Sequence, residues 1–168
     1  KNMFDLKSDM LLDILRVKLL SQLRENMGMV YSVSVSSSSR VIPAPLARNM
    51  ISFTSKPEDY ELLISTIKSI INTMAENPES FERELANVKK NIINDKNVNV
   101  QQDSFWSTFI RNTTFNGQHD WYFIADYEDI VNSITVKELS ELLIHNFNKN
   151  NIIEAVLLPK NREIFLTN

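Results

Sequence analysis

Cysteine, glycine and histidine are scarce in this sequence. Its 168 residues include no cysteine, two glycines and two histidines. Without cysteine the chain can form neither a disulfide framework nor a zinc site built on thiolates. With so few glycines it has no loop of the kind that cradles phosphates and no dinucleotide-binding fingerprint. These classes of site are therefore excluded.

The residues that metal or nucleophilic catalysis requires are also missing. His119 and His145 lie too far apart for the i, i+4 pair that zinc sites favour, and neither has a glutamate at metal-motif spacing. We expect His145 on a helix face and His119 in a loop. None of the many serines lies in a nucleophile-elbow sequence. The sequence therefore predicts no catalytic residue and no bound metal in this chain.

Charged residues are spread along the whole chain. The formal net charge is −3, and the nearest thing to a basic cluster, Lys89-Lys90, is too short for a nucleic-acid surface. Charges interrupt the apolar runs far short of the roughly 20 apolar residues of a membrane span. No signal-peptide pattern follows Lys1, and a start at Lys1 fits a piece of a longer protein. We therefore expect a soluble, cytoplasmic or periplasmic chain with no nucleic-acid and no membrane partner.

The first part of the chain has the pattern of a helix followed by two strands. Ser8 and Asp9 are placed to cap the helix, and Gly28 to end it in a left-handed conformation. Between them leucines recur at helical spacing. These are Leu11, Leu12, Leu15, Leu19, Leu20 and Leu23.

The period of the pattern then changes from helical to two. From Val30 to Ser38 apolar residues and serines alternate, which predicts a strand with one buried face and one small, polar face. The predicted buried face contains Tyr31, Val33 and Val35. A loop at Pro43 and Pro45 leads to a second strand over residues 50–53, which should be antiparallel to the first because the connection is short.

Helical patterns dominate the rest of the chain. Residues 55–58 have the spacing of a capping box and precede a long apolar stripe. The stripe consists of Tyr60, Leu63, Ile64, Ile67, Ile70, Ile71 and Met74. Ser80 is placed to cap the next helix, and we expect a kink or loop in the asparagine-rich stretch 94–99.

Two more helices and a final strand are predicted after that stretch. Aromatic residues around Trp106 share a helical face, which we expect in the core, before Asn116-Gly117 ends the helix. Thr135 and Glu138 form a second capping box. The almost wholly apolar run 152–158 predicts a central strand buried on both faces. The sum is an α+β fold over residues 1–168, a single domain whose mostly antiparallel sheet has helices packed on one face.

Several of these segments occur in an order that resembles a known family. The leucine-rich helix ends in Leu23-Arg24-Glu25, and Gly28, Tyr31, a strand, a loop and a strand with Phe53 follow. Further matching segments are Lys56-Pro57-Glu58, Ser80 to Lys89, Ile134-Thr135 with Leu139, and the late apolar strand before Pro159. This order resembles the C-terminal-half domains of pitrilysin-type, or inverted-zincin, zinc metallopeptidases.

The resemblance implies a role within a larger peptidase. In that family two related halves enclose a chamber, and the zinc lies on an H-x-x-E-H motif in the N-terminal half. That motif is absent here, so the resemblance implies zinc in the parent protein and none bound by this chain. The implied partners are a peptide substrate and a zinc-bearing N-terminal half, in the same protein or in a partner subunit. By motif match, Arg24 and Tyr31 would bind the substrate.

Both residues also have purely structural interpretations. An arginine in the last turn of a helix is favoured by the helix dipole, by about 0.3–1 kcal/mol. In a regular strand Tyr31 would share the buried face of Val33 and Val35. A guanidinium and a phenol can, however, also donate hydrogen bonds to peptide carbonyls or to a developing oxyanion.

Two further points stay open at the level of sequence. The family's domain has a strand ahead of its first helix, but Lys1 to Lys7 is too short and polar to form it, so we expect an unpaired sheet edge or a strand lent by a neighbour. The main functional alternative is a catalytically dead structural or peptide-binding subunit of the same fold. A free-standing α+β interaction domain is a third.

Overall fold

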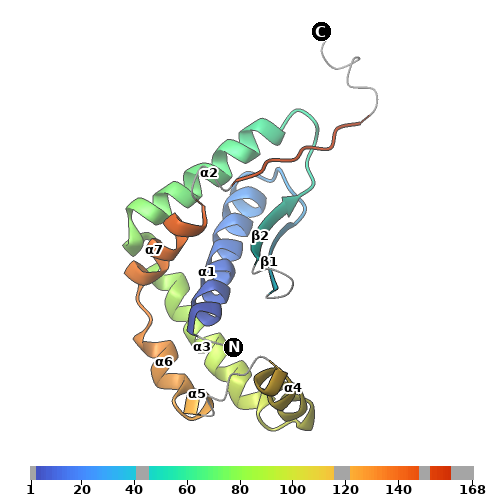
Figure 1. Cartoon of the computed structure of the whole chain (residues 1–168). Coiled ribbons are helices and arrows are strands. Elements are labelled where there is room, and N and C mark those ends of the chain that lie inside the picture. The colour runs from blue at the N-terminus through green and yellow to red at the C-terminus, as the bar shows by residue number, and fades with distance from the viewer. Residues whose placement is uncertain (1–2, 41–45, 116–121, 148–151, 160–168) are drawn as a thin grey trace, which may run out of the picture.

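Helices make up most of the structure. The computed structural model describes residues 3–40, 46–115, 122–147 and 152–159 (Figure 1). Its elements, in chain order, are α1 (Met3–Leu19), η1 (Leu20–Asn26), β1 (Val33–Arg40), β2 (Leu46–Phe53), α2 (Tyr60–Glu76), η2 (Pro78–Phe81), α3 (Glu82–Asn99), α4 (Asp103–Phe115), α5 (Tyr122–Ala125), α6 (Tyr127–Ser133) and α7 (Val136–Asn146). The α+β class is confirmed, but the sheet is smaller than expected, because in the described residues it has two strands. None of the helices in these ranges is long and apolar enough to cross a bilayer.

Helix α1 is the centre of the core. Most of the predicted leucine stripe is buried, except Leu20, which is partly exposed. Helix α1 packs against β1, α3 and α7. The helix begins at Met3, so the prediction that Ser8 and Asp9 cap it is wrong. Leu6 is buried together with the stripe, which extends the apolar face by one turn and favours an earlier start.

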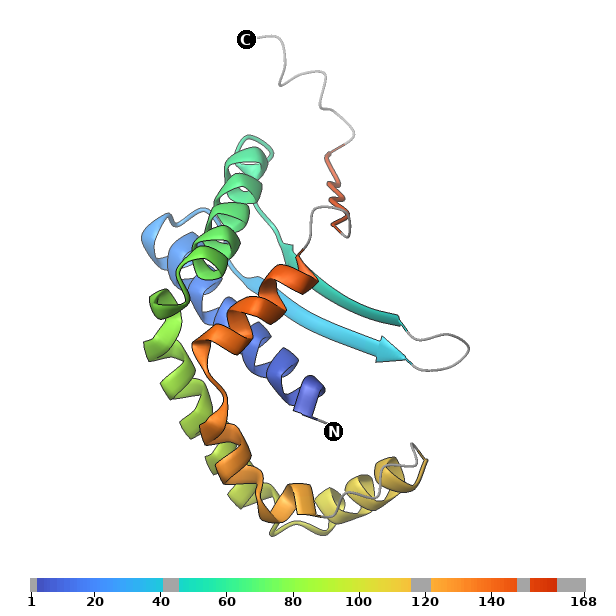
Figure 2. The same ribbon diagram turned by 60° about the vertical axis from the view of Figure 1, so that its left-hand side comes forward.

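Strands β1 and β2 form the predicted antiparallel hairpin, which Figure 2 shows extending past the start of α1. Val33 pairs with Phe53 and Val35 with Ile51. Both valines are buried, whereas Ser34 and Ser36, which alternate with them, are exposed. The predicted two-faced strand is therefore confirmed for these residues, while the loop predicted at Pro43 and Pro45 lies outside the described residues.

Three helix boundaries differ from the predictions. Helix α2 begins at Tyr60 without a side-chain cap, and the Ser55 hydroxyl instead donates to the Lys56 carbonyl. Ser80 lies inside the short 3₁₀ helix η2 and caps nothing. Helix α3 continues through Asn99, without the predicted kink. Residues 82–99 contain no glycine or proline, and asparagine alone disfavours a helix too weakly to break it.

The aromatic face of α4 is not part of the main core. Trp106 and Ile110 are exposed, and Phe105 stacks on Phe109 with ring centroids 6.1 Å apart. The Trp106 indole donates to the carbonyl of Val100 at 2.8 Å. The rings thus shield one another beside the end of α3. Figures 1 and 2 both show α4 at a distance from α1 and the hairpin.

The apolar run near the end of the chain also differs from its prediction. Residues 152–159 form no regular secondary structure, and most of their side chains are exposed. The central strand predicted there is therefore wrong for the described residues. The physical reason is that a strand needs a neighbour, and the sequence pattern reveals the apolar run but not what pairs with it.

The capping box at the start of α7 is confirmed and has a charged neighbour. Glu138 N–H donates to the Thr135 hydroxyl, and the Glu138 carboxylate accepts from Thr135 N–H at 2.8 Å. The same carboxylate accepts from the Lys7 ammonium of α1 at 2.8 Å. The hydrogen bond from Lys7, helped by that from the Thr135 backbone, lowers the pKa of Glu138 from 4.5 to about 2.

This pKa predicts a pH-dependent contribution of Glu138 to stability. Because the folded pKa lies below the unfolded one, the contribution is present at neutral pH and is lost as the pH falls from about 4.5 towards 2. We expect Glu138→Gln to lower the free energy of unfolding by about 1 kcal/mol at pH 7, because the partly exposed pair is screened by solvent. The difference from wild type should shrink towards zero in urea titrations as the pH is lowered to about 2. A difference that does not change with pH would contradict the role of the charge, and Glu141→Gln, at an exposed position of α7, is the control.

Candidate functional site

Arg24 lies on the surface at the end of the first helix. Residues Leu20–Asn26 form a π-helix. π-Helices are rare and occur frequently at functional sites. Leu23 is fully buried and the next residue, Arg24, is exposed. Within the described residues its guanidinium makes no ion pair or hydrogen bond. The prediction that Arg24 is available to a ligand thus agrees with its exposure, and its position in the last turn also suits the helix dipole.

A closed turn connects Arg24 to the hairpin. Met29 N–H donates to the Leu23 carbonyl and Gly28 N–H to the Arg24 carbonyl, both at 3.1 Å. Gly28 has a φ of +65°, as predicted for a left-handed helix end. A β-carbon there would meet nothing within 4 Å. The backbone conformation, and not lack of space, is therefore what favours glycine at this position.

Tyr31 points away from the core. Strand β1 begins at Val33, and Tyr31 lies in the bend before it with 88% of its surface exposed. The expectation that Tyr31 shares the buried face of Val33 is wrong, because the regular alternation starts only after Tyr31. Two residues of extended chain span about 7 Å at most. The backbone of Met29 is hydrogen-bonded to Leu23, the residue before Arg24. Tyr31, two residues after Met29, therefore lies close to this end of the helix.

The outward face of the hairpin is small and mostly polar. Ser34 pairs with Ser52 and Ser36 with Met50, and all four side chains are exposed. The same strand leads back through the exposed Ser32 to Tyr31. The candidate surface therefore consists of the turn that carries Arg24 and Tyr31, continued by this face of the sheet.

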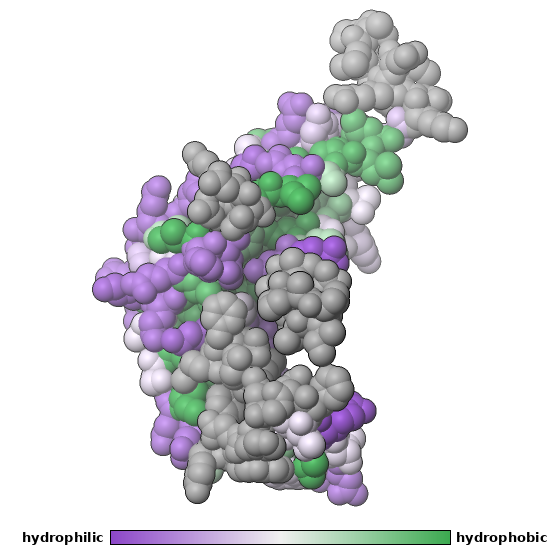
Figure 3. Space-filling view, in the orientation of Figure 1, coloured by the Kyte–Doolittle hydropathy of each residue, from purple (hydrophilic) through white to green (hydrophobic). Residues whose placement is uncertain are grey.

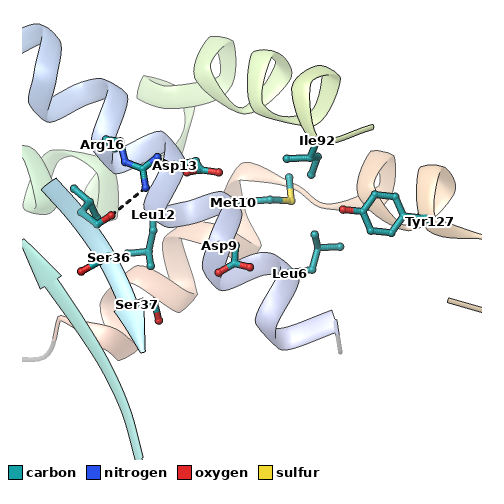
Figure 4. A pocket seen from close by; sticks show the side chains of 11 residues that line it. Leu6, Asp9, Met10, Leu12, Asp13, Arg16, Ser36, Ser37, Ile92 and Tyr127 are labelled. Carbon is teal, nitrogen blue, oxygen red and sulfur yellow. Dashed lines mark hydrogen bonds and ion pairs between the residues drawn. The ribbon is translucent and has the colours of Figure 1, made fainter. Parts of the chain in front are cut away.

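Arg24 and Tyr31 line neither of two hollows in the part of the chain that the structure describes. One of them, of about 260 Å³, lies between α1, β1, α3 and α6 (Figure 4). In it Arg16 pairs with Asp13 at 3.0 Å and donates to the Val35 carbonyl at 3.0 Å, which ties α1 to β1. The sequence analysis did not single out this hollow, although the spacing of Asp9, Asp13 and Arg16 places all three on one helix face.

The described residues do not fit a zinc ion. They contain no group of three or more histidine, aspartate or glutamate side chains placed to hold a metal. His145 is exposed on α7, as predicted, and His119 lies outside the described ranges. The H-x-x-E-H motif is absent from the sequence. A zinc ion implied by the family resemblance has no ligand set here.

The fold described above is shared with segments of two solved protease structures. No family model and no curated protein matches this sequence. Two solved structures share the fold. One is a protease from Helicobacter pylori, with a TM-score of 0.66 and 18% identity over 86% of this chain and 36% of that one. The other is the periplasmic protease PqqL from Escherichia coli, with a TM-score of 0.61 and 21% identity over 83% of this chain and 16% of that one.

These similarities settle the fold and leave the residue roles open. The predicted resemblance to pitrilysin-type peptidases is confirmed at the level of the fold. The chain spans only 36% and 16% of the two proteases it matches. Substrate binding by Arg24 and Tyr31 stays a prediction.

Proposed function

We propose that residues 1–168 form the non-catalytic C-terminal domain of a zinc-dependent peptidase. In this proposal the domain closes the chamber and binds the substrate peptide, which is hydrolysed by a zinc-bearing N-terminal half in the same protein or in a partner subunit. The fold shared with segments of two proteases supports it. The sequence also lacks the H-x-x-E-H motif, which in this proposal lies in the N-terminal half.

The exposure of Arg24 and Tyr31 on one turn is the observation that carries the proposed role in binding. An arginine offers five N–H donors in a planar fork, and a tyrosine offers one hydroxyl that can donate or accept. Peptide backbone presents carbonyl acceptors at every residue. Two unpaired donor groups beside a polar sheet face can therefore hold an extended peptide by its backbone, with little dependence on its side chains.

The charge of Arg24 gives this contact a further chemical use. Hydrogen bonds from an ionised donor contribute about 1.5–3 kcal/mol, more than neutral ones. A guanidinium also interacts more strongly with a carbonyl oxygen as negative charge develops on it during hydrolysis. We therefore expect Arg24 to affect turnover as well as binding, and Tyr31 to act mainly by positioning the peptide.

The class of protein can be tested on the complete coding sequence. We expect an H-x-x-E-H motif outside these 168 residues. The complete protein should then hydrolyse an internally quenched peptide, lose at least 100-fold of its activity with a chelator and regain it with zinc. A complete sequence without the motif, together with peptide binding but no hydrolysis, would instead establish the catalytically dead subunit. A coding region that begins at this segment would favour the free-standing interaction domain.

A further inference from the structure

Acidic residues are absent from the sequence of the hairpin and of the turn before it. Residues 26–57 contain no aspartate or glutamate, whereas the whole chain has 21 acidic and 18 basic residues. The basic residues of this segment are Arg40, Arg48 and Lys56. The acidic residues that border it are Glu25 and Glu58. A chain with a net charge of −3 thus contains one long segment whose charges are all positive.

Arg48 of β2 lies on the outward face of the hairpin. It pairs in register with Ser38, and both side chains are exposed. Met50 and Ser52, at the next alternate positions of β2, are exposed on the same face. Within the described residues the Arg48 guanidinium makes no ion pair or hydrogen bond. All of its N–H donors are therefore open to a ligand.

The surroundings of Arg48 leave its charge as the main means of binding. Asp9 and Asp13 of α1 line the hollow beside β1 (Figure 4), where Asp13 is paired with Arg16 at 3.0 Å. In the described part of the chain, no residue of β2 lines that hollow. Figure 3 shows exposed apolar surface gathered beside the first turns of α2, where Leu62 is 49% exposed. The outward face of β2 offers a ligand positive charge more than apolar area.

Arg48 and the pair Arg24 and Tyr31 lie at opposite ends of the candidate surface. Ser38, the partner of Arg48, comes five residues after Val33, where β1 begins. Five residues of strand span about 17 Å. Tyr31 precedes Val33 by two further residues. An extended peptide held at Tyr31 therefore reaches Arg48 with a side chain about five to seven residues away.

We infer that Arg48 is a specificity-determining residue, and that it favours peptides with an aspartate or glutamate about five to seven residues from the bond held at Arg24. This inference rests on the proposed function, because it assigns a second contact to the same peptide. A guanidinium binds a carboxylate through two parallel hydrogen bonds. A lysine of the peptide at the same place would be repelled, and such repulsion suppresses binding of the wrong partner.

The observations favour an acidic peptide over a nucleic acid as the partner of this face. Nucleic-acid surfaces need several clustered lysines and arginines, because each neutralised phosphate contributes to affinity. Among the described side chains of the outward face, Arg48 is accompanied by serines and Met50. One arginine is enough to recognise one carboxylate.

Three internally quenched peptides of otherwise identical sequence test the preference on the complete protein. They carry serine, aspartate or lysine at the positions about five to seven residues from the scissile bond, on both sides of it. We expect kcat/KM to be highest for the aspartate peptide and lowest for the lysine peptide. The two should differ by about three- to tenfold, mainly in KM, because an exposed ion pair is weak. Salt at about 1 M should remove most of the difference.

Variants of Arg48 separate a direct contact from a general effect of charge. Arg48→Glu should reverse the order, so that the lysine peptide is preferred, and Arg48→Gln should abolish the preference. Arg83→Glu makes the same charge reversal at an exposed position of α3 and should keep the wild-type order. Thermal melts check that each variant is folded. Equal rates for the three peptides in the wild-type protein would overturn the inference, and so would a wild-type order in a folded Arg48→Glu variant.

Binding measurements separate a failure of this inference from a failure of the proposed function. Fluorescence anisotropy of the same three sequences, each with a single dye, gives Kd values without hydrolysis. The preference stands and the peptidase function fails if no peptide is hydrolysed, the aspartate peptide binds most tightly and Arg48→Glu reverses the order. Hydrolysis of all three peptides at one rate overturns the preference and leaves the peptidase function standing. Neither hydrolysis nor binding of any of the three overturns both.

Discussion

Replacing Arg24 by alanine in the complete protein should lower kcat/KM for an internally quenched peptide by about 100- to 1000-fold. This is the typical loss when one donor to a developing oxyanion is removed, equivalent to about 3–4 kcal/mol of barrier. The guanidinium is exposed and makes no polar contact with another described residue. Its removal should therefore leave the fold intact, with a change in unfolding free energy below about 1 kcal/mol.

Matched variants separate a role in the reaction from a general effect of charge. Tyr31→Phe removes one hydroxyl and should lower kcat/KM by a smaller factor, about 10- to 100-fold, mainly through KM. Arg24→Lys keeps the charge but loses the planar fork, so we expect it to restore only part of the activity. Arg83→Ala removes an exposed arginine from α3 and should change the rate less than twofold. Wild-type rates for both Arg24→Ala and Tyr31→Phe would eliminate the proposed binding roles, and a rate loss that only parallels a fall in Tm would assign Arg24 to structure.

The parts of the fold that were predictable are those that local sequence decides. The leucine stripe of α1 forms one buried face whichever element it packs against. The alternation of Val33 and Val35 with serines predicts a strand as long as one face of it is covered. The capping box of Thr135 and Glu138 is closed within a single helical turn. Each of these depends on residues at most a few positions apart. Their prediction was correct for that reason.

The features that were not predictable depend on partners elsewhere in the chain. Tyr31 breaks the alternation because β1 starts at the first residue paired with β2, and this register is set by Phe53, 20 positions after Val33 in the chain. Trp106 and Ile110 have an apolar helical pattern, but no described element covers them. Residues 152–158 have the composition of a central strand and lack its neighbours in the described residues. In each case the local pattern does not contain the partner that decides whether the side chain is buried.

The candidate site shows the same division between local and distant information. The spacing of Arg24, Gly28 and Tyr31 suggested a connected site, and the left-handed conformation of Gly28 confirms the turn between them. The direction of Tyr31 could not be derived from the alternation, which indicated the core. The hollow beside Asp9, Asp13 and Arg16 forms only when α1, β1 and α3 are packed together.

Replacing Leu23 by alanine should lower the stability of the fold, unlike the change at its neighbour Arg24. Leu23 is completely buried within the hydrophobic core, which includes residues of α1, β1 and α2. Truncating a buried leucine removes its apolar contacts and leaves a cavity, which costs about 2–5 kcal/mol. For a domain of this size that corresponds to a fall in Tm of roughly 5–15 °C. Urea unfolding and thermal melts of the variant measure the loss.

Comparing the variants at Leu23 and Arg24 also tests how the π-helix positions these two residues. In η1 the Leu23 carbonyl accepts from Met29 N–H, six residues on, so the residue that anchors the helix in the core also closes the turn that leads to Tyr31. We therefore expect Leu23→Ala, unlike Leu23→Met, to reduce peptide hydrolysis well below its Tm, because a loosened helix end no longer fixes Arg24 and Tyr31 relative to each other. Leu23→Met nearly conserves volume and should cost less than about 1.5 kcal/mol. Wild-type stability for Leu23→Ala would mean that Leu23 is not buried as described, and full activity in a destabilised variant would show that the turn holds its geometry without this anchor.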